Sequence, residues 1–91
     1  MPSSREVVET LRFRRALEVI QEDDPKAAIA FREGVAFAIA RNPGLGFTVP
    51  GLPEASGLPF HTERGSYLAI YVFDAEVVRF IAIRKVPSGP Y

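Results

Sequence analysis

The most apolar part of the chain lies near its end, where two runs of β-branched and aromatic residues flank Asp74-Ala75-Glu76. Such runs suit a pleated, buried surface, and an Asp starts a turn readily because its side chain can bond its own backbone. The pattern predicts a β-hairpin with strands near Tyr67–Phe73 and Val77–Arg84. A two-residue loop at Asp74-Ala75 is the simplest connection, but a slightly longer loop also fits, because Asp-Ala is not a favoured pair for such turns.

The two-residue loop predicts a register for the hairpin, with Tyr71 opposite Val78 and Leu68 opposite Ile81. Both faces of the hairpin are then apolar apart from Arg79. A strand with one solvent-exposed face would alternate more regularly between apolar and polar residues. We therefore expect central strands, covered by helices on one face and by something else on the other.

Helical spacing precedes the hairpin. Phe13, Leu17 and Ile20 follow it and predict a first helix that reaches Gln21. Asp24-Pro25 is typical of a helix start, since Asp caps free N–H groups and Pro suits the first helical position. The second helix should run from there to about Arg41.

Residues 35–40, near the end of the second helix, are all apolar. A helix that is apolar all round is buried all round. Two interpretations of Phe37 stay open, because its ring either packs between the helices or is exposed to a partner.

The remaining segments complete a small domain. A short strand at residues 6–10 is favoured over a helix that begins at Ser3 with Glu6 in a capping box. Residues 42–59 are rich in Pro and Gly and predict a loop, and Phe60–Arg64 predicts one more short strand. The chain thus reads as one α+β domain over residues 1–91. We expect an antiparallel sheet, formed by the N-terminal strand and three C-terminal strands, with a two-helix hairpin on one face.

Composition narrows the chemistry. The 91 residues suffice for one small domain, and the absence of Cys removes disulfides and thiol chemistry. A single His argues against a histidine metal site, so we expect no metal and no cofactor. No apolar run is long enough for a membrane span and no signal segment is seen, so a cytoplasmic location without membrane contact is expected. The 11 basic and 11 acidic residues argue weakly against non-specific binding to nucleic acid.

Five short segments point to a family by their order and spacing. They are Asp24-Pro25-Lys26-Ala27-Ala28, Asn42-Pro43-Gly44-Leu45-Gly46, Gly51-Leu52-Pro53, Ser66-Tyr67-Leu68-Ala69-Ile70-Tyr71-Val72 and Asp74-Ala75-Glu76-Val77-Val78. With the order of elements above, the chain resembles the RelE/ParE superfamily of toxins from bacterial type II toxin–antitoxin systems, which include plasmid stabilisation proteins. The resemblance covers nearly the whole chain.

The resemblance implies one of two unlike activities. RelE-like members enter the ribosomal A site and cut mRNA without a metal, using basic side chains, sometimes a carboxylate or histidine, and a C-terminal tyrosine. ParE-like members bind DNA gyrase and are not nucleases. Both kinds are neutralised by an antitoxin whose C-terminal segment wraps the toxin.

Metal-free RNA cleavage needs a base, a cation for the charge that develops on phosphate, and an acid for the leaving oxygen. One position argues against this activity, because Leu68 stands where RelE-like nucleases usually carry an arginine, and leucine cannot clamp a phosphate. The residues that would form a rearranged nuclease site near one end of the sheet are His61, Glu63, Arg64, Arg84, Lys85 and Tyr91.

Three functions therefore stay open: a ParE-like toxin that inhibits by binding, a RelE-like nuclease with a rearranged site, and a superfamily member that has lost toxicity. In all three, large exposed apolar surfaces would mark interaction sites. We expect a cognate antitoxin, or failing that a homodimer, to cover a surface that includes Phe37, Leu68 and Ile81. An antitoxin would contribute a helix laid in a groove or a strand added at the sheet edge.

Overall fold

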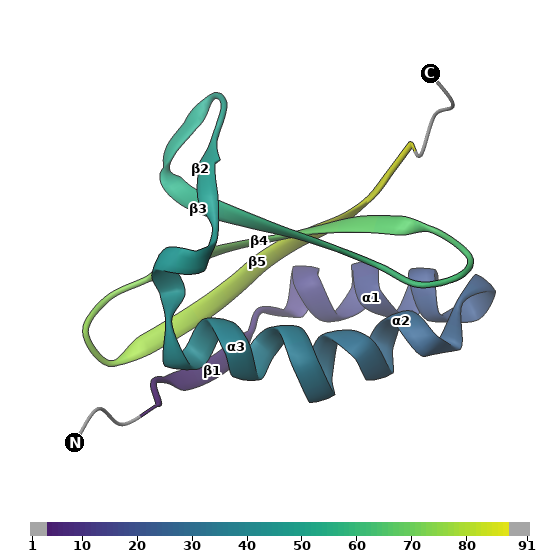
Figure 1. Ribbon diagram of the computed structural model, residues 1–91, viewed down its shortest axis with the longest axis horizontal. Coiled ribbons are helices and arrows are strands. Elements are labelled where there is room, and N and C mark those ends of the chain that lie inside the picture. The colour runs from purple at the N-terminus through teal and green to yellow at the C-terminus, as the bar shows by residue number, and fades with distance from the viewer. Residues whose placement is uncertain (1–3, 88–91) are drawn as a thin grey trace.

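Five strands form one mixed sheet in the order β1-β5-β4-β3-β2, and a helical hairpin covers one of its faces (Figure 1). The computed structural model describes residues 4–87. The α+β class predicted from the sequence is confirmed. The elements are β1 (Glu6–Glu9), α1 (Leu11–Asp23), α2 (Pro25–Ala30), the π-helical segment η1 (Phe31–Val35), α3 (Ala36–Arg41), the 3-10 turn η2 (Pro43–Leu45), β2 (Phe47–Val49), β3 (Leu52–His61), β4 (Ser66–Phe73) and β5 (Val77–Val86).

The sheet differs from the predicted one in strand number and direction. The N-terminal strand forms as expected, but it pairs in parallel with β5, with Glu6 opposite Val77. The other neighbouring pairs are antiparallel, so the sheet is mixed and the expectation of a purely antiparallel sheet was wrong. A strand's direction depends on where the preceding and following elements pack, which the four residues of β1 do not encode.

The additional strand, β2, comes from residues 42–59, which the sequence predicted to be loop. This was wrong, because β2 and most of β3 lie there, joined at Pro50 and Gly51. Gly51 takes a φ of 83°. A positive φ is what a type II turn with Pro at its first central position requires at its second central residue. Pro59 is tolerated within β3 because β2 ends its pairing at Gly57, which leaves the outer edge of β3 without a partner strand at that point.

The strands of the C-terminal hairpin are confirmed, but its predicted register was wrong. Tyr71 lies opposite Phe80 instead of Val78, and Leu68 lies opposite Arg84. The loop is longer than two residues, and a register shift after Ile70 inserts one extra residue into β5.

The side chain of Asp74 stabilises this longer loop. Its Oδ1 accepts hydrogen bonds of 2.8 Å from the backbone N–H groups of both Glu76 and Val77. The turn that the Asp predicted is therefore present, but it closes around four residues.

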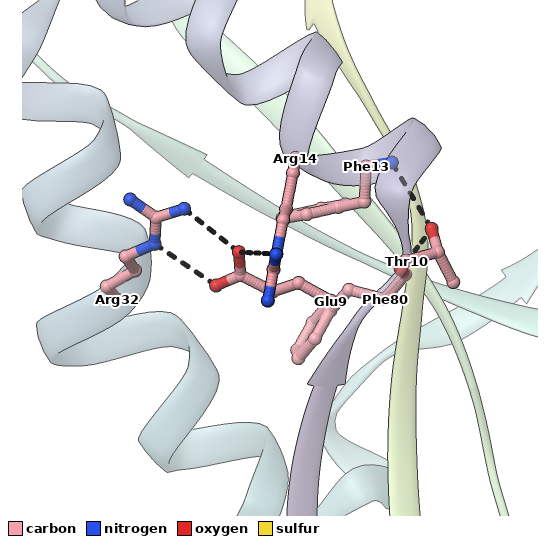
Figure 2. A network of polar contacts seen from close by, with 6 residues as sticks. All are labelled: Glu9, Thr10, Phe13, Arg14, Arg32 and Phe80. Carbon is pink, nitrogen blue, oxygen red and sulfur yellow. Dashed lines mark hydrogen bonds and ion pairs between the residues drawn. The ribbon is translucent and has the colours of Figure 1, made fainter.

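Aromatic rings fill the core between the helices and the sheet. The rings of Phe31 and Phe80 meet edge to face with centroids 4.7 Å apart, and Phe13 lies 4.8 Å from Phe31. Thr10 caps α1 by accepting a 3.2 Å hydrogen bond from the N–H of Phe13, which fixes where that ring enters the core (Figure 2). Both predicted helices are confirmed, the second as the continuous run α2-η1-α3.

The apolar end of the second helix is buried on one side only. Ala36, Ile39 and Ala40 are buried, whereas Phe37 is 64% exposed. Of the two interpretations of Phe37, exposure to solvent is correct and packing between the helices is wrong. Among the helices of residues 4–87, none has the length and apolar character needed to cross a membrane.

Candidate functional site

The sheet face that the helices leave open carries an apolar cluster. The hairpin of β2 and β3 bends away from the helices toward this side (Figure 1). We call this surface the open face. Its buried members are Val49, Ala55 and Ile70, and its half-buried members are Leu68, Val72, Ile81 and Ala82. The predicted partner-binding residues Leu68 and Ile81 both belong to it, so the sheet covers part of the second apolar face of the hairpin by itself.

Two exposed arginines flank the open face along β5. Arg79 pairs with Val72 and Arg84 pairs with Leu68, so each arginine shares the face of its apolar partner. Every salt bridge among residues 4–87 involves Glu9, so neither guanidinium is paired with a described carboxylate. The open face is therefore an apolar surface with an exposed guanidinium group at each end along β5, and the charge of Arg79 also acts on the Asp74 carboxylate.

Two of the predicted catalytic residues lie at one end of the open face. His61 of β3 lies opposite Ser66 of β4. Arg84 of β5 lies opposite Leu68, two residues further along β4. With strand β4 between them, their Cα atoms are roughly 12 Å apart by ordinary strand spacings. The two side chains can approach one extended ligand from this face.

Three other predicted residues lie elsewhere at the same end. Lys85 is opposite Tyr67 on the helix side of the sheet. Arg64 lies between β3 and β4, and its guanidinium donates a hydrogen bond to the backbone carbonyl of Asp23. Glu63 and Arg64 line a pocket of about 380 Å³ at the start of α2. The sixth residue, Tyr91, lies outside the described residues. The five described members of the predicted set therefore lie near one end of the sheet but are not on one face.

A buried carboxylate at this end was not foreseen. Asp24 is 2% exposed, and its Oδ2 accepts hydrogen bonds from the hydroxyl of Tyr67, at 2.7 Å, and from the hydroxyl of Thr62. The sequence predicted that Asp24 caps α2, but its side chain makes no capping hydrogen bond and is turned to the sheet instead. An Asp before a Pro is typical of a helix cap in any sequence. No local pattern around Asp24 predicts hydrogen bonds to residues as distant in sequence as Thr62 and Tyr67.

The hydrogen bonds set the ionisation of this group. The bond from Thr62 is the largest cause that lowers the pKa of Asp24, so the carboxyl is ionised at neutral pH. Burial, followed by the bond to Asp24, raises the pKa of Tyr67 to about 12. The pair therefore joins the helical hairpin to the sheet as a charged acceptor and a neutral donor, which suits a structural role.

A second candidate surface lies on the other side of the molecule, where β1 meets the second helix. A groove of about 210 Å³ is lined there by Val7, Glu9, Arg32, Ala36 and Phe37, and we call it the Phe37 groove. The structure thus places the three predicted partner-binding residues on two surfaces, with Phe37 separate from Leu68 and Ile81.

Glu9 and Arg32 of the Phe37 groove form an ion pair, which Figure 2 shows. Nη2 and Nε of Arg32 donate hydrogen bonds of 2.9 and 3.1 Å to the two carboxylate oxygens of Glu9, and these bonds raise the pKa of Arg32. Nε of Arg14 lies 3.9 Å from the same carboxylate. One carboxylate from β1 thus faces two guanidinium groups, one from α1 and one from η1.

Comparisons of the chain with protein-family models, with curated proteins and with solved structures give no match. The resemblance to the RelE/ParE superfamily therefore rests on the sequence segments given above and stays a prediction. What the structure adds is the position of each candidate residue, two apolar surfaces and their charges.

Proposed function

We propose that the chain is the toxin of a type II toxin–antitoxin module and that it inhibits growth by binding its target, with DNA gyrase as the target that the ParE-like resemblance implies. The observation that carries this proposal is the open face, an apolar surface flanked by Arg79 and Arg84. A cognate antitoxin would neutralise the toxin by covering this face.

The composition of the open face favours binding over cleavage. Apolar side chains with arginine at their margin are typical of protein–protein interfaces, where arginine anchors the contact and apolar area excludes water. Leu68 lies at the Arg84 end of the open face, and it stands where the family resemblance implies a phosphate-binding arginine for a nuclease. Arg64 is already bonded to a backbone carbonyl, and Lys85 lies on the other side of the sheet.

The RelE-like nuclease is the second candidate, and a specific observation supports it. His61 and Arg84 share the open face at one end of the sheet. A histidine can transfer protons at neutral pH, and an arginine can stabilise charge that develops on a phosphate. The nuclease would therefore need both side chains, whereas a binding toxin needs the apolar surface between the arginines.

Induced expression in a bacterium tests the two candidates together. Growth, total translation and plasmid supercoiling would be followed for the wild type, Leu68→Asp, Arg79→Glu and His61→Ala. Val19→Asp is the matched control, because Val19 is 66% exposed on α1, away from the open face. Arg79 and His61 are exposed, so their variants should fold, and circular dichroism would check each chain.

A binding toxin should arrest growth and relax the plasmid while translation continues, with arrest relieved by Leu68→Asp and Arg79→Glu but not by His61→Ala. A collapse of translation that His61→Ala relieves would make the chain a nuclease. Unchanged growth with soluble, folded wild type would overturn the toxin proposal and leave a superfamily member that only binds proteins.

A further inference from the structure

The tip of the β2–β3 hairpin extends beyond the rest of the sheet. β3 begins at Leu52, but its register with β4 starts only at Ser56, which lies opposite Tyr71. Because β2 is an edge strand, residues 48–55 form a two-stranded hairpin, and it bends toward the side of the open face (Figure 1). We call these residues the arm. A two-stranded hairpin is only marginally stable by itself, so the position of the arm depends on its contacts with the sheet.

Two small side chains hold the arm on the open face. Val49 and Ala55 are its buried residues, with exposed fractions of 9% and 3%. They pack in one cluster with Ile70 of β4, which is 1% exposed and is the most buried member of the open face. The remaining residues of the arm are exposed. The buried contact between the arm and the sheet is therefore small and apolar.

The backbone of β3 lets the arm lie close to the sheet. A Cβ on Gly57 would lie 3.2 Å from Cγ2 of Val49 and 3.1 Å from Cδ1 of Leu68. The two side chains therefore meet above a residue that has none, and Val49 reaches the part of the open face that Leu68 occupies. In this closed position the arm covers Ile70.

The arm is stiff at its tip and irregular at its base. Pro50 and Pro53 each fix a φ angle, and Gly51 forms the tight turn between them. The register of β2 with β3 shifts between Thr48 and Val49, which interrupts the ladder where the arm begins. Hinges are a few positions at the ends of elements that absorb a change in backbone angles. This arrangement favours rotation of the whole arm over melting of its turn.

We propose that the arm is a lid on the open face, which opens and closes while the rest of the fold stays intact. In the closed position Val49 and Ala55 cover Ile70. In the open position Ile70 is added to the apolar surface that Leu68 and Val72 offer on the same face of β4. The use of this lid, to regulate binding at the open face, rests on the proposed function. Its motion, however, is measured without any partner.

Thiol labelling of cysteine variants with iodoacetamide tests the lid, because the chain has no Cys and each variant carries a single thiol. Val49→Cys and Ala55→Cys lie under the arm. Val78→Cys and Ala69→Cys are matched controls, since both positions are 0% exposed in the core under the helices. Thr48→Cys, at an exposed position, gives the rate without protection. Buried groups react only when the structure around them opens. Both arm variants should react about tenfold or more faster than the controls and about tenfold or more slower than Thr48→Cys.

The response to a weaker core separates local opening from unfolding of the whole chain. Ala28 is buried in α2, on the helix side of the sheet. Ala28→Gly should speed the labelling of Ala69→Cys about two- to fivefold, which is the effect of a glycine inside a helix on the unfolded population. It should leave the labelling of Ala55→Cys unchanged. Urea should also speed the control more steeply, because unfolding of the whole chain exposes more surface than opening of the arm.

Two results would overturn the lid. Equal labelling at the arm and control positions, with equal responses to urea and to Ala28→Gly, would mean that the arm opens only when the chain unfolds. Arm thiols that react as fast as Thr48→Cys would mean that the arm does not close. A urea titration of each variant would verify that it folds. Protected but rapidly opening arm thiols in a chain that does not arrest growth would support the lid and overturn only the toxin proposal.

Discussion

The hydroxyl of Tyr67 donates a 2.7 Å hydrogen bond to Oδ2 of Asp24, although 43 residues separate the two along the chain. Asp24 lies where α1 ends and α2 begins, and Tyr67 is the second residue of β4, the middle strand of the sheet. The bond therefore attaches the closed end of the helical hairpin to β4. Hydrogen bonds to a charged, buried acceptor are among the stronger ones in proteins.

Replacing Tyr67 by Phe should lower the free energy of unfolding by about 1.5–3 kcal/mol, because the ionised acceptor loses a buried donor. Urea unfolding followed by circular dichroism measures this loss. In an Asp24→Asn background the same replacement should cost less, since the acceptor is no longer charged. Equal losses in both backgrounds would show that the charge of the acceptor does not strengthen this hydrogen bond.

Alkaline pH should weaken the fold through the same tyrosine. Burial raises the pKa of Tyr67 to about 12 from its ordinary value of 10.0. Above pH 10 the unfolded chain ionises first, so the contribution of Tyr67 is complete below pH 10 and is lost as the pH rises toward 12. The stability difference between wild type and Tyr67→Phe should therefore narrow over this window. A constant difference from pH 9 to pH 12 in thermal unfolding would contradict the buried, neutral phenol.

Acid should weaken the fold through two aspartates. The hydrogen bond from Thr62 lowers the pKa of Asp24, and the N–H of Glu76 lowers the pKa of Asp74, each from its ordinary value of 3.8. Their contribution is present above pH 3.8 and is lost as the pH falls below it, through the pKa of each folded group. Thr62→Val should make the loss of stability below pH 3.8 shallower. The control is Thr48→Val at an exposed position of β2, which should leave the acid slope unchanged.

Replacement by alanine should change the stability of the fold in opposite directions at two glycines. A Cβ on Gly46 would lie 2.4 Å from the hydroxyl of Tyr71 and 2.7 Å from the carbonyl of Gly57. That hydroxyl accepts from the N–H of Gly46 at 3.0 Å and donates to the carbonyl of Pro43 at 2.6 Å, so it cannot move freely. Gly46→Ala should therefore destabilise the fold by about 1–3 kcal/mol, as overpacking does.

Gly34 is the matched control for that prediction. It lies within the second helix, and a Cβ there would meet nothing within 4 Å. Gly34→Ala should stabilise the fold by about 0.5–1 kcal/mol, because alanine loses less conformational entropy in a helix. Urea midpoints that move in the same direction for both variants would contradict the close contact at Gly46.

Elements governed by local patterns could be predicted from the sequence. The 3.6-residue spacing of Phe13 and Leu17 marks α1, Asp24-Pro25 marks the start of α2, and apolar runs around an Asp turn mark β4 and β5. Each of these signals lies within about one turn or one strand of the element that it specifies. For the candidate site, the same reasoning placed His61 and Arg84 at one end of the sheet, where the structure has them.

Only the tertiary structure decided the features that depend on distant partners. Asp24 meets Tyr67 and Thr62 instead of capping its helix, and Pro59 fits in a strand because β2 does not pair with the outer edge of β3 at that point. The parallel direction of β1 and the separation of the two apolar surfaces follow from how the elements pack. The physical reason is one of range, since periodicity and turn chemistry act between neighbours in sequence. Strand pairing and buried hydrogen bonds join groups that the folded chain alone brings together.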